Sequence, residues 1–92
     1  MTFTYDPNKE SINISIHGVS FDEAFTSILD PDAIWIYDIE HSITEDRWIS
    51  IGMSNRQRVL FTSFTMRGDE VYRIISSREA DNKERKLYEG KS

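Results

Sequence analysis

"RWISIGMSNRQRVLFTSFTMRGDEVYRIIS", residues 47–76, contains three runs of β-forming residues separated by two turn segments. In the first run, Ile49 and Ile51 alternate with Trp48 and Ser50, which is the two-residue period of a strand with two different faces. The turn segments are "SNRQ" and "RGDE", and Gly68 in the second is free to take a positive φ. The stretch predicts an antiparallel β-meander.

The region before the meander predicts two helices. Asp-Pro at 6–7 is a helix start signal, and Gly18 is suited to end the helix in the left-handed conformation, so a helix is expected near 7–17. Ile12 and Ile16 are four residues apart, which predicts that this helix buries one face.

A second helix is expected near 20–29. It begins with a capping box, Ser20 followed three residues later by Glu23. Its apolar residues recur at helical spacing and are expected in the core: Phe21, Phe25, Ile28 and Leu29.

Further strands are expected on either side of these helices. "TFTY" at 2–5 has the alternation of a short strand, and "AIWIY" at 33–37 extends the meander to a sheet of about 33–77. A final helix near 79–88, capped by Ser76 or Ser77, has an acidic first turn and basic later turns, as the helix dipole favours. Its apolar stripe is thin, so we expect it to be loosely attached and available to a partner.

These elements predict one α+β domain over residues 1–92, with an antiparallel sheet flanked by two N-terminal helices and one C-terminal helix. The 92 residues include no cysteine, and 38% are apolar and 29% charged. Neither a signal peptide nor an apolar segment of membrane-spanning length is evident, so a soluble cytoplasmic protein is expected.

The net charge of −5 is unevenly distributed. Residues 1–55 contain two basic and ten acidic side chains, whereas residues 56–92 contain nine basic and six acidic ones. This asymmetry is compatible with a basic patch, and equally with charges that are simply solvated.

Several kinds of site are disfavoured by the residue pattern. His17 and His41 are the only histidines and lie 24 residues apart without a metal-ligand spacing, so structural roles are the alternative to catalysis. No glycine-rich phosphate loop and no nucleophile elbow are present. No metal or other cofactor is predicted.

Arginines remain as candidates for phosphate binding, because a guanidinium donates two parallel hydrogen bonds to a phosphate. Four of the arginines in or near the meander are the candidates: Arg47, Arg67, Arg73 and Arg78. We expect Arg73 and Arg78 to lie within reach of each other around a bend. The alternative for Arg73 is an ion pair, with Glu45 or Glu84.

Three longer fragments resemble the BrnT family of ribonuclease toxins. "FTYDPNKESINISIHGVSFDEA" at 3–24 resembles the family's opening, F-x-W-D-x-x-K-x-x-x-N-x-x-K-H-G-V-S-F-x-E-A. "DIEHSITEDRWISIG" at 38–52 resembles D-x-x-H-x-x-x-E-x-R-x-x-x-I-G. "TMRGDEVYRIISSREADNKERKLYE" at 65–89 resembles T-x-R-G, R-I-I-S-A-R-x-A and a closing E-R-x-x-Y. The order and spacing of these elements extend over most of the chain.

The resemblance implies a RelE/ParE-like fold and an endoribonuclease of a type II toxin–antitoxin pair that needs no metal. In that chemistry the 2′-OH of the RNA attacks the neighbouring phosphate, and arginines stabilise the developing charge. The matched positions are Arg67, Arg73 and Arg78 for phosphate, and His17, His41 or Glu45 for proton transfer. The implied partners are RNA, a BrnA-like antitoxin and, through the antitoxin complex, operator DNA.

Two departures from the family pattern predict a weak ribonuclease. Ile16 stands where the family has a lysine, and Glu79 stands where it often has another, so two cations near the expected site are missing. Alternatives to a functioning nuclease are a protein-binding module whose nuclease has decayed and a plain structural domain with internally paired charges.

Overall fold

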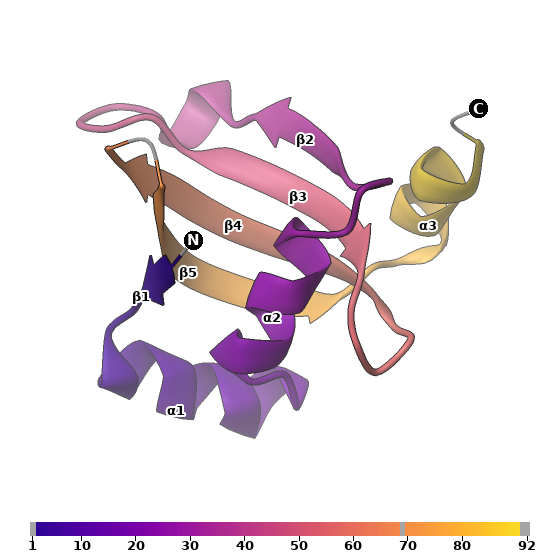
Figure 1. The fold of residues 1–92 in the computed structure, drawn as a ribbon, viewed down its shortest axis with the longest axis horizontal. Helices are drawn as coiled ribbons and strands as arrows, with labels where there is room; N and C mark the ends of the chain where they lie inside the picture. Colours follow the sequence, from indigo (N-terminus) through magenta and orange to yellow (C-terminus); the bar gives the residue numbers. More distant parts are fainter. Residues whose placement is uncertain (1, 69, 91–92) are drawn as a thin grey trace.

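The computed structural model describes residues 2–68 and 70–90. Its elements are β1 Thr2–Thr4, α1 Pro7–His17, α2 Phe21–Ile28, β2 Ile34–Tyr37, the short 3-10 helix η1 Ile39–His41, β3 Trp48–Met53, β4 Val59–Arg67, β5 Val71–Glu79 and α3 Asn82–Gly90. Figure 1 shows α2 crossing one face of the sheet and α3 set apart at the end where β5 finishes. No helix in the described ranges is long and apolar enough to cross a membrane.

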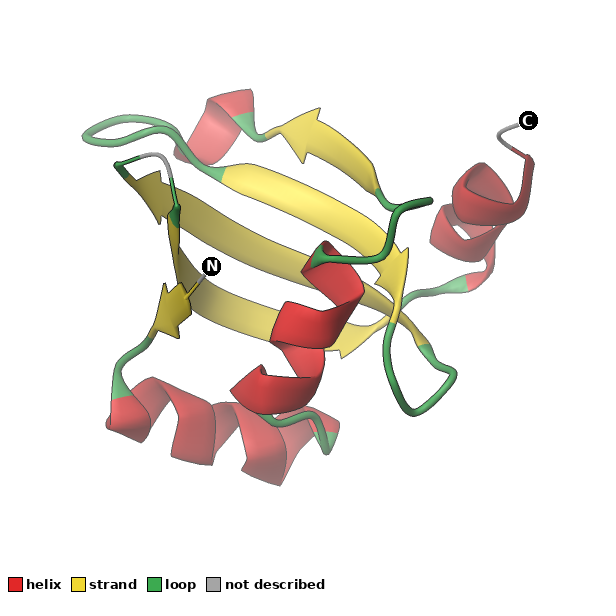
Figure 2. Ribbon diagram, viewed as in Figure 1, coloured by secondary structure: helices red, strands yellow, loops and turns green. Residues whose placement is uncertain are grey.

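Five strands form the sheet, in the order β1-β5-β4-β3-β2 (Figure 2). The strands from β2 to β5 pair antiparallel with their chain neighbours, so the predicted meander is confirmed. β1, however, pairs parallel with β5, so the sheet is mixed rather than wholly antiparallel. Parallel pairing is possible because a long connection, containing both N-terminal helices and three strands, separates β1 from β5. The predicted α+β class is correct.

The α2 side of the sheet holds the main core. The core residues are fully or almost fully buried: Val19, Phe21, Ala24, Ile28, Leu60, Phe64, Tyr72 and Ile74. Phe25 is half-buried and packs on Phe3 and Tyr72. Leu29, expected in the core, is 40% exposed because it is the C-cap of α2.

The prediction that Ile12 and Ile16 form a buried face of α1 is wrong. They are 59% and 68% exposed, and the buried residue of α1 is the polar Asn13. β1 pairs only with Val71–Arg73 of β5, which leaves the rest of that edge without a strand. At this edge the Asn13 amide accepts a hydrogen bond from the Ser77 backbone N–H (3.0 Å) and donates to the Ser77 carbonyl (2.8 Å). α1 therefore covers an open sheet edge. The unpaired backbone groups of that edge need hydrogen bonds, which the Asn13 amide provides and apolar side chains cannot.

The C-terminal part also differs from the prediction. β5 continues to Glu79, so the serines expected to cap the last helix lie within the strand. Instead, Asp81 and Glu84 form a reciprocal cap: the Glu84 backbone N–H donates to Asp81 Oδ1 (2.8 Å), and the Asp81 backbone N–H donates to Glu84 Oε1 (2.9 Å). In the predicted "RGDE" turn Gly68 has the expected positive φ of 71°, while Asp69 lies outside the described residues.

α3 packs over one end of the face opposite α2, against a small cluster of Ile51, Val59, Phe61 and Ala80 with Tyr88. No residue of α3 is buried, in agreement with its thin apolar stripe. Polar contacts also attach this helix, among them a hydrogen bond of 2.5 Å from the Tyr88 hydroxyl to Asp30 Oδ2. The remainder of this face, which we call the open face, is not covered by a helix.

Candidate functional site

The open face contains a hollow of about 450 Å³, here called the first hollow. Its floor comes from the three central strands and its wall from the segment between β2 and β3. The lining residues are Asp38, Glu40, His41, Arg47, Ile49, Phe61, Ser63, Ile75 and Ser76. An apolar floor with a few polar groups at the rim is the usual composition of a ligand site.

A β-bulge in β5 shapes this floor. Ser63 pairs with Ser76 and Phe64 pairs with Ile74, so Ile75 is an extra residue. The extra residue reverses the face of the sheet on which each later side chain of β5 lies. Arg78, which pairs with Phe61, therefore lies on the same face as Arg73, which pairs with Thr65. Without the bulge, two residues five positions apart in one strand would lie on opposite faces.

His41 and Asp38 form a polar pair at the rim. His41 Nδ1 is 2.9 Å from Asp38 Oδ2, and the histidine side chain is 63% exposed while that of Asp38 is 16% exposed. A carboxylate at Nδ1 favours the tautomer that carries its proton there, which leaves Nε2 as the proton acceptor. Across residues 2–68 and 70–90, Nε2 has no hydrogen-bond partner.

The segment that holds this pair is fixed by Ser42. Its hydroxyl donates to the Asp38 carbonyl (2.7 Å) and accepts from the Arg47 backbone N–H (2.9 Å). The Asp38 backbone N–H in turn donates to the Arg47 carbonyl (2.9 Å). These bonds close the loop between β2 and β3, and they set His41 and the half-buried Arg47 beside the same hollow.

A second hollow, of about 270 Å³, lies between α1 and β5. It is lined by Lys9, Ile12, Asn13, Ile16 and His17 of α1 and by Ile75 and Ser76 of β5. The two bulge-region residues belong to both hollows, which are therefore neighbours. Thus the structure separates the two histidines: His41 borders the first hollow and His17 the second.

The remaining candidates are less available. Arg67 and Glu45 form a salt bridge of 3.3 Å, and their side chains are 54% and 40% exposed. Arg73 is half-buried opposite Thr65 and forms no salt bridge within the described ranges. The ion-pair alternatives for Arg73 are not what the structure shows, because Glu45 pairs with Arg67, and Glu84 pairs with Arg78.

Arg78 is bound to other groups of the protein. Its two terminal nitrogens donate to the Glu84 carboxylate at 2.8 and 2.9 Å, and its guanidinium carbon lies 4.2 Å from the centre of the Phe61 ring. The Glu84 hydrogen bond raises the pKa of Arg78, and the same contact lowers the pKa of Glu84. The expected bend beside Arg73 is absent, since both arginines belong to β5 and are separated by roughly 16 Å of strand.

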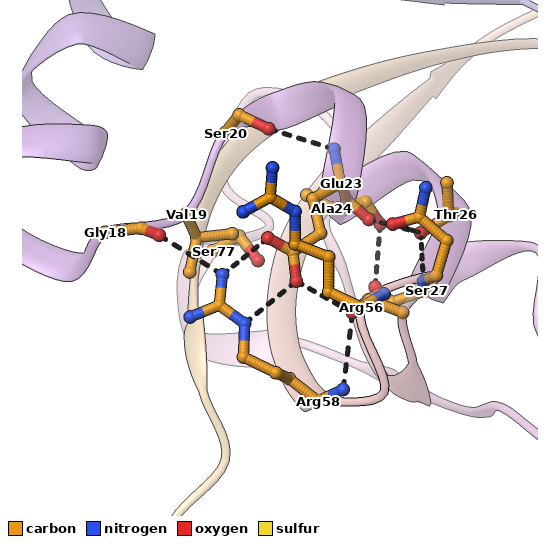
Figure 3. Close-up of polar contacts among 12 residues, drawn as sticks. Gly18, Val19, Ser20, Glu23, Ala24, Thr26, Ser27, Arg56, Arg58 and Ser77 are labelled. Atoms are coloured by element: carbon orange, nitrogen blue, oxygen red, sulfur yellow. Dashed lines mark hydrogen bonds and ion pairs between the residues drawn. The ribbon is translucent and has the colours of Figure 1, made fainter.

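A further ion pair, between Glu23 and Arg58, was not predicted from the sequence. Arg58 Nε donates to Glu23 Oε2 (2.9 Å; Figure 3). The Ser54 hydroxyl donates to the same oxygen (2.7 Å), and the Glu23 side chain is only 4% exposed. The hydrogen bond from Arg58 lowers the pKa of Glu23.

The predicted capping box is therefore half formed. The Ser20 hydroxyl caps the Glu23 backbone N–H, but the Glu23 side chain binds Arg58 instead of returning to Ser20. Arg58 also donates to the Gly18 carbonyl (3.1 Å). The sequence signal that could have indicated this pair is Glu23 itself, a charged residue on the apolar face of α2. The ion pair lies on the side of the sheet that α2 covers, and neither residue lines the first or the second hollow.

No group of three or more potential metal ligands (His, Cys, Asp, Glu) is found in the part of the chain that the structure describes. The first hollow offers an imidazole, the Asp38 carboxylate that contacts it, a second carboxylate from Glu40, and one arginine, together with serine hydroxyls on the floor. Such a set is suited to proton transfer beside a phosphate.

Comparison with known proteins points to one family. A model of the family described as the ribonuclease toxin BrnT of type II toxin–antitoxin systems matches residues 5–84. The crystal structure of the ribonuclease toxin BrnT from Brucella abortus is similar, with a TM-score of 0.69 and 28% sequence identity. That match covers 89% of this chain and 99% of the Brucella chain. No curated protein sequence matches significantly.

Proposed function

We propose that this chain, which belongs to the BrnT family of ribonuclease toxins of type II toxin–antitoxin systems, cleaves RNA in the first hollow. Family membership implies an antitoxin partner. The finer proposal is that residues 1–92 act as one cytoplasmic toxin domain, an endoribonuclease that uses the 2′-OH of its substrate rather than a metal ion.

In the proposed reaction, Nε2 of His41 accepts the proton of the 2′-OH, whose oxygen attacks the adjacent phosphorus. The O2′–P bond forms, the P–O5′ bond breaks, and the proton passes to O5′. The products are a 2′,3′-cyclic phosphate and a 5′-hydroxyl end. A positioned acid–base group of this kind contributes roughly 10²–10⁴-fold to the rate.

Arg47 is proposed to stabilise the charge of the phosphorane, because it borders the hollow beside His41. Arg73 is half-buried in β5, does not line the hollow and is not engaged by a carboxylate of the described residues, so it is proposed to contact a neighbouring phosphate. Arg67, the last residue of β4, pairs with Glu45 of the segment between β2 and β3 and is proposed to contact a flanking phosphate. Arg78 and His17 take no part in this proposed chemistry, because one is bonded to Glu84 and the other borders the second hollow.

The contact between His41 and Asp38 carries the proposal. It supports a defined tautomer at the rim of a hollow, on a segment whose backbone is tied down by Ser42. Operator DNA is proposed to be bound through the antitoxin, because a chain with a net charge of −5 has little electrostatic attraction for DNA by itself.

The test is cleavage of an RNA oligonucleotide by the full chain in the presence of EDTA. His41→Ala is expected to lower kcat by roughly 10²-fold or more, with the unfolding midpoint unchanged. The matched control is His17→Ala, a histidine of the neighbouring hollow, which is expected to cleave as the unsubstituted chain does. Equal cleavage by His41→Ala, or loss of cleavage in EDTA, would refute the proposal.

A weak nuclease that acts mainly by binding its antitoxin is the second candidate. The observation in its favour is that Asp38 and Glu40 line the first hollow, where their charges repel an RNA phosphate, while Arg47 is the only arginine or lysine among the described residues that line it. Glu79, one of the two departures from the family pattern, lies opposite Leu60 and lines neither hollow. A Glu40→Lys variant is expected to cleave RNA faster at matched salt. No gain in rate would remove the support for this second candidate.

A further inference from the structure

The second hollow has an apolar rim on α1. Ile12 and Ile16 are 59% and 68% exposed, four residues apart on the side of α1 that faces the hollow, and Ile75 lies across from them on β5. Moving an isoleucine side chain out of water is favourable, so exposed isoleucines favour contact with other apolar groups. Three of them around one hollow form a groove suited to apolar side chains.

The charged group that lines this groove is basic. Lys9 precedes Ile12 on the helix, the imidazole of His17 follows Ile16, and no carboxylate of the described residues lines the groove. The first hollow, by contrast, is lined by Asp38 and Glu40. In a chain with a net charge of −5, a groove that offers a lysine and a histidine but no acid selects an occupant with acidic groups beside its apolar ones.

RNA fits this groove poorly. Nucleic-acid binding relies on several cations for the phosphates and on aromatic rings for the bases, whereas this lining has one lysine and, among the described residues, no phenylalanine, tyrosine or tryptophan. A second copy of the chain also fits poorly, because a two-fold contact through α1 would place the same basic groove, with Lys9 and no carboxylate of the described residues, on both sides of the contact.

We propose, on the basis of the toxin function proposed above, that the second hollow receives an amphipathic segment of the antitoxin. The apolar side chains of that segment lie against Ile12, Ile16 and Ile75, and its carboxylates lie near Lys9 and His17. Because Ile75 and Ser76 also line the first hollow, the bound segment narrows access to His41. Binding at this groove thereby links antitoxin capture to inhibition.

The experiment measures, by calorimetry, the affinity of the purified chain for its full-length cognate antitoxin. Ile12→Glu and Ile16→Glu are each expected to weaken binding by roughly tenfold or more, as for a central apolar contact. The matched control is Ile14→Glu on the same helix: Ile14 is also exposed, at 46%, but does not line the groove, so its binding is expected to stay unchanged.

RNA cleavage by the free variants separates this proposal from the nuclease proposal. All three variants are expected to cleave as the unsubstituted chain does, whatever the absolute rate. The inference is overturned by unchanged antitoxin binding in Ile12→Glu and Ile16→Glu, or by an equal loss in Ile14→Glu. Weakened RNA binding with normal antitoxin binding, or a change from dimer to monomer in light scattering, would assign the groove to RNA or to a second copy and would also overturn it.

Discussion

The two faces of the sheet differ in how their polar groups are used. On the α2 side, aromatic and aliphatic side chains are buried, and the charged Glu23 is bonded to both Arg58 and Ser54. On the open face, Asp38 pairs with His41. Within the described ranges, no carboxylate pairs with Arg47 or Arg73. The covered face therefore provides most of the stability, and the open face keeps cations and an imidazole free for a ligand.

The largest expected effect is a substitution in the covered core. Phe21 is fully buried and contacts Tyr5 edge-on, so Phe21→Ala is expected to lower the free energy of unfolding by about 3–5 kcal/mol through cavity formation. Urea denaturation measures the loss.

Two comparisons sharpen that result. Phe25, which its helical spacing placed in the core, is only half-buried, so Phe25→Ala is expected to cost less, about 2 kcal/mol. Ile49→Ala, on the floor of the open face, is expected to cost less than Phe21→Ala as well. An equal cost at Ile49 would mean that the two faces contribute alike.

The next effect concerns the buried ion pair. Arg58→Ala removes the partner of a carboxylate that is 4% exposed, and the expected loss is about 3 kcal/mol at pH 7. The matched substitution is Arg78→Ala, whose side chain is 38% exposed, with an expected loss of about 1 kcal/mol. If both losses are equal, burial does not distinguish the two pairs.

The pH dependence of the same pair has a definite sign. The folded-state pKa of Glu23 is lowered, so its stabilising contribution is complete above the ordinary value of 4.5 and is lost as the pH falls through the lowered pKa. The stability of the unsubstituted chain is therefore expected to decrease below pH 4.5 more steeply than that of Arg58→Ala. Parallel curves from pH 2 to pH 6 would contradict this assignment.

A smaller effect is expected at high pH, where α3 is attached. The hydrogen bond to Asp30 raises the pKa of Tyr88 to about 12 from its ordinary 10.0. The contribution of this bond is therefore complete below pH 10 and is lost as the pH rises towards 12. The protection of the α3 amides, relative to their intrinsic exchange rate at each pH, is expected to fall over this range in the unsubstituted chain and to be low already at neutral pH in Tyr88→Phe. Slow exchange in Tyr88→Phe at neutral pH would show that other contacts hold the helix.

The smallest stability effect is expected at Arg67. Its salt bridge with Glu45 is exposed, and Arg67→Ala is expected to change the free energy of unfolding by less than about 0.5 kcal/mol. A moderate loss of RNA affinity at low salt, with stability intact, would agree with a phosphate contact. A loss of stability above 1 kcal/mol would instead make this pair a structural one.

The meander could be predicted because strand alternation and turn residues are local signals. α1 was harder: Ile12 and Ile16 have the spacing of a buried face, but the long-range partner of the helix is the backbone edge at Ser77, which binds Asn13. Helical periodicity identifies an apolar side without showing whether the fold or a partner covers it. The exposure of these isoleucines is therefore information that only the tertiary structure supplies.

The candidate site was partly predictable for the same reason. His41 and Arg47 are six residues apart, so one loop brings them together, whereas the relation of Arg73 to Arg78 depends on a bulge that no local signal marks. The partner of Arg78 was missed because β5 was expected to end before this residue. Which arginine binds phosphate is a question of tertiary pairing, and residue type alone does not answer it.

The most direct test of the central claim is an NMR titration of the chain with a non-cleavable 2′-O-methyl RNA oligonucleotide. The account predicts that amide shifts concentrate at His41, Arg47, Ser63 and Ser76 on the open face and leave Glu23 and Ala24 of α2 unchanged. Shifts concentrated on α2, or an absence of shifts around His41 at saturating RNA, would contradict it.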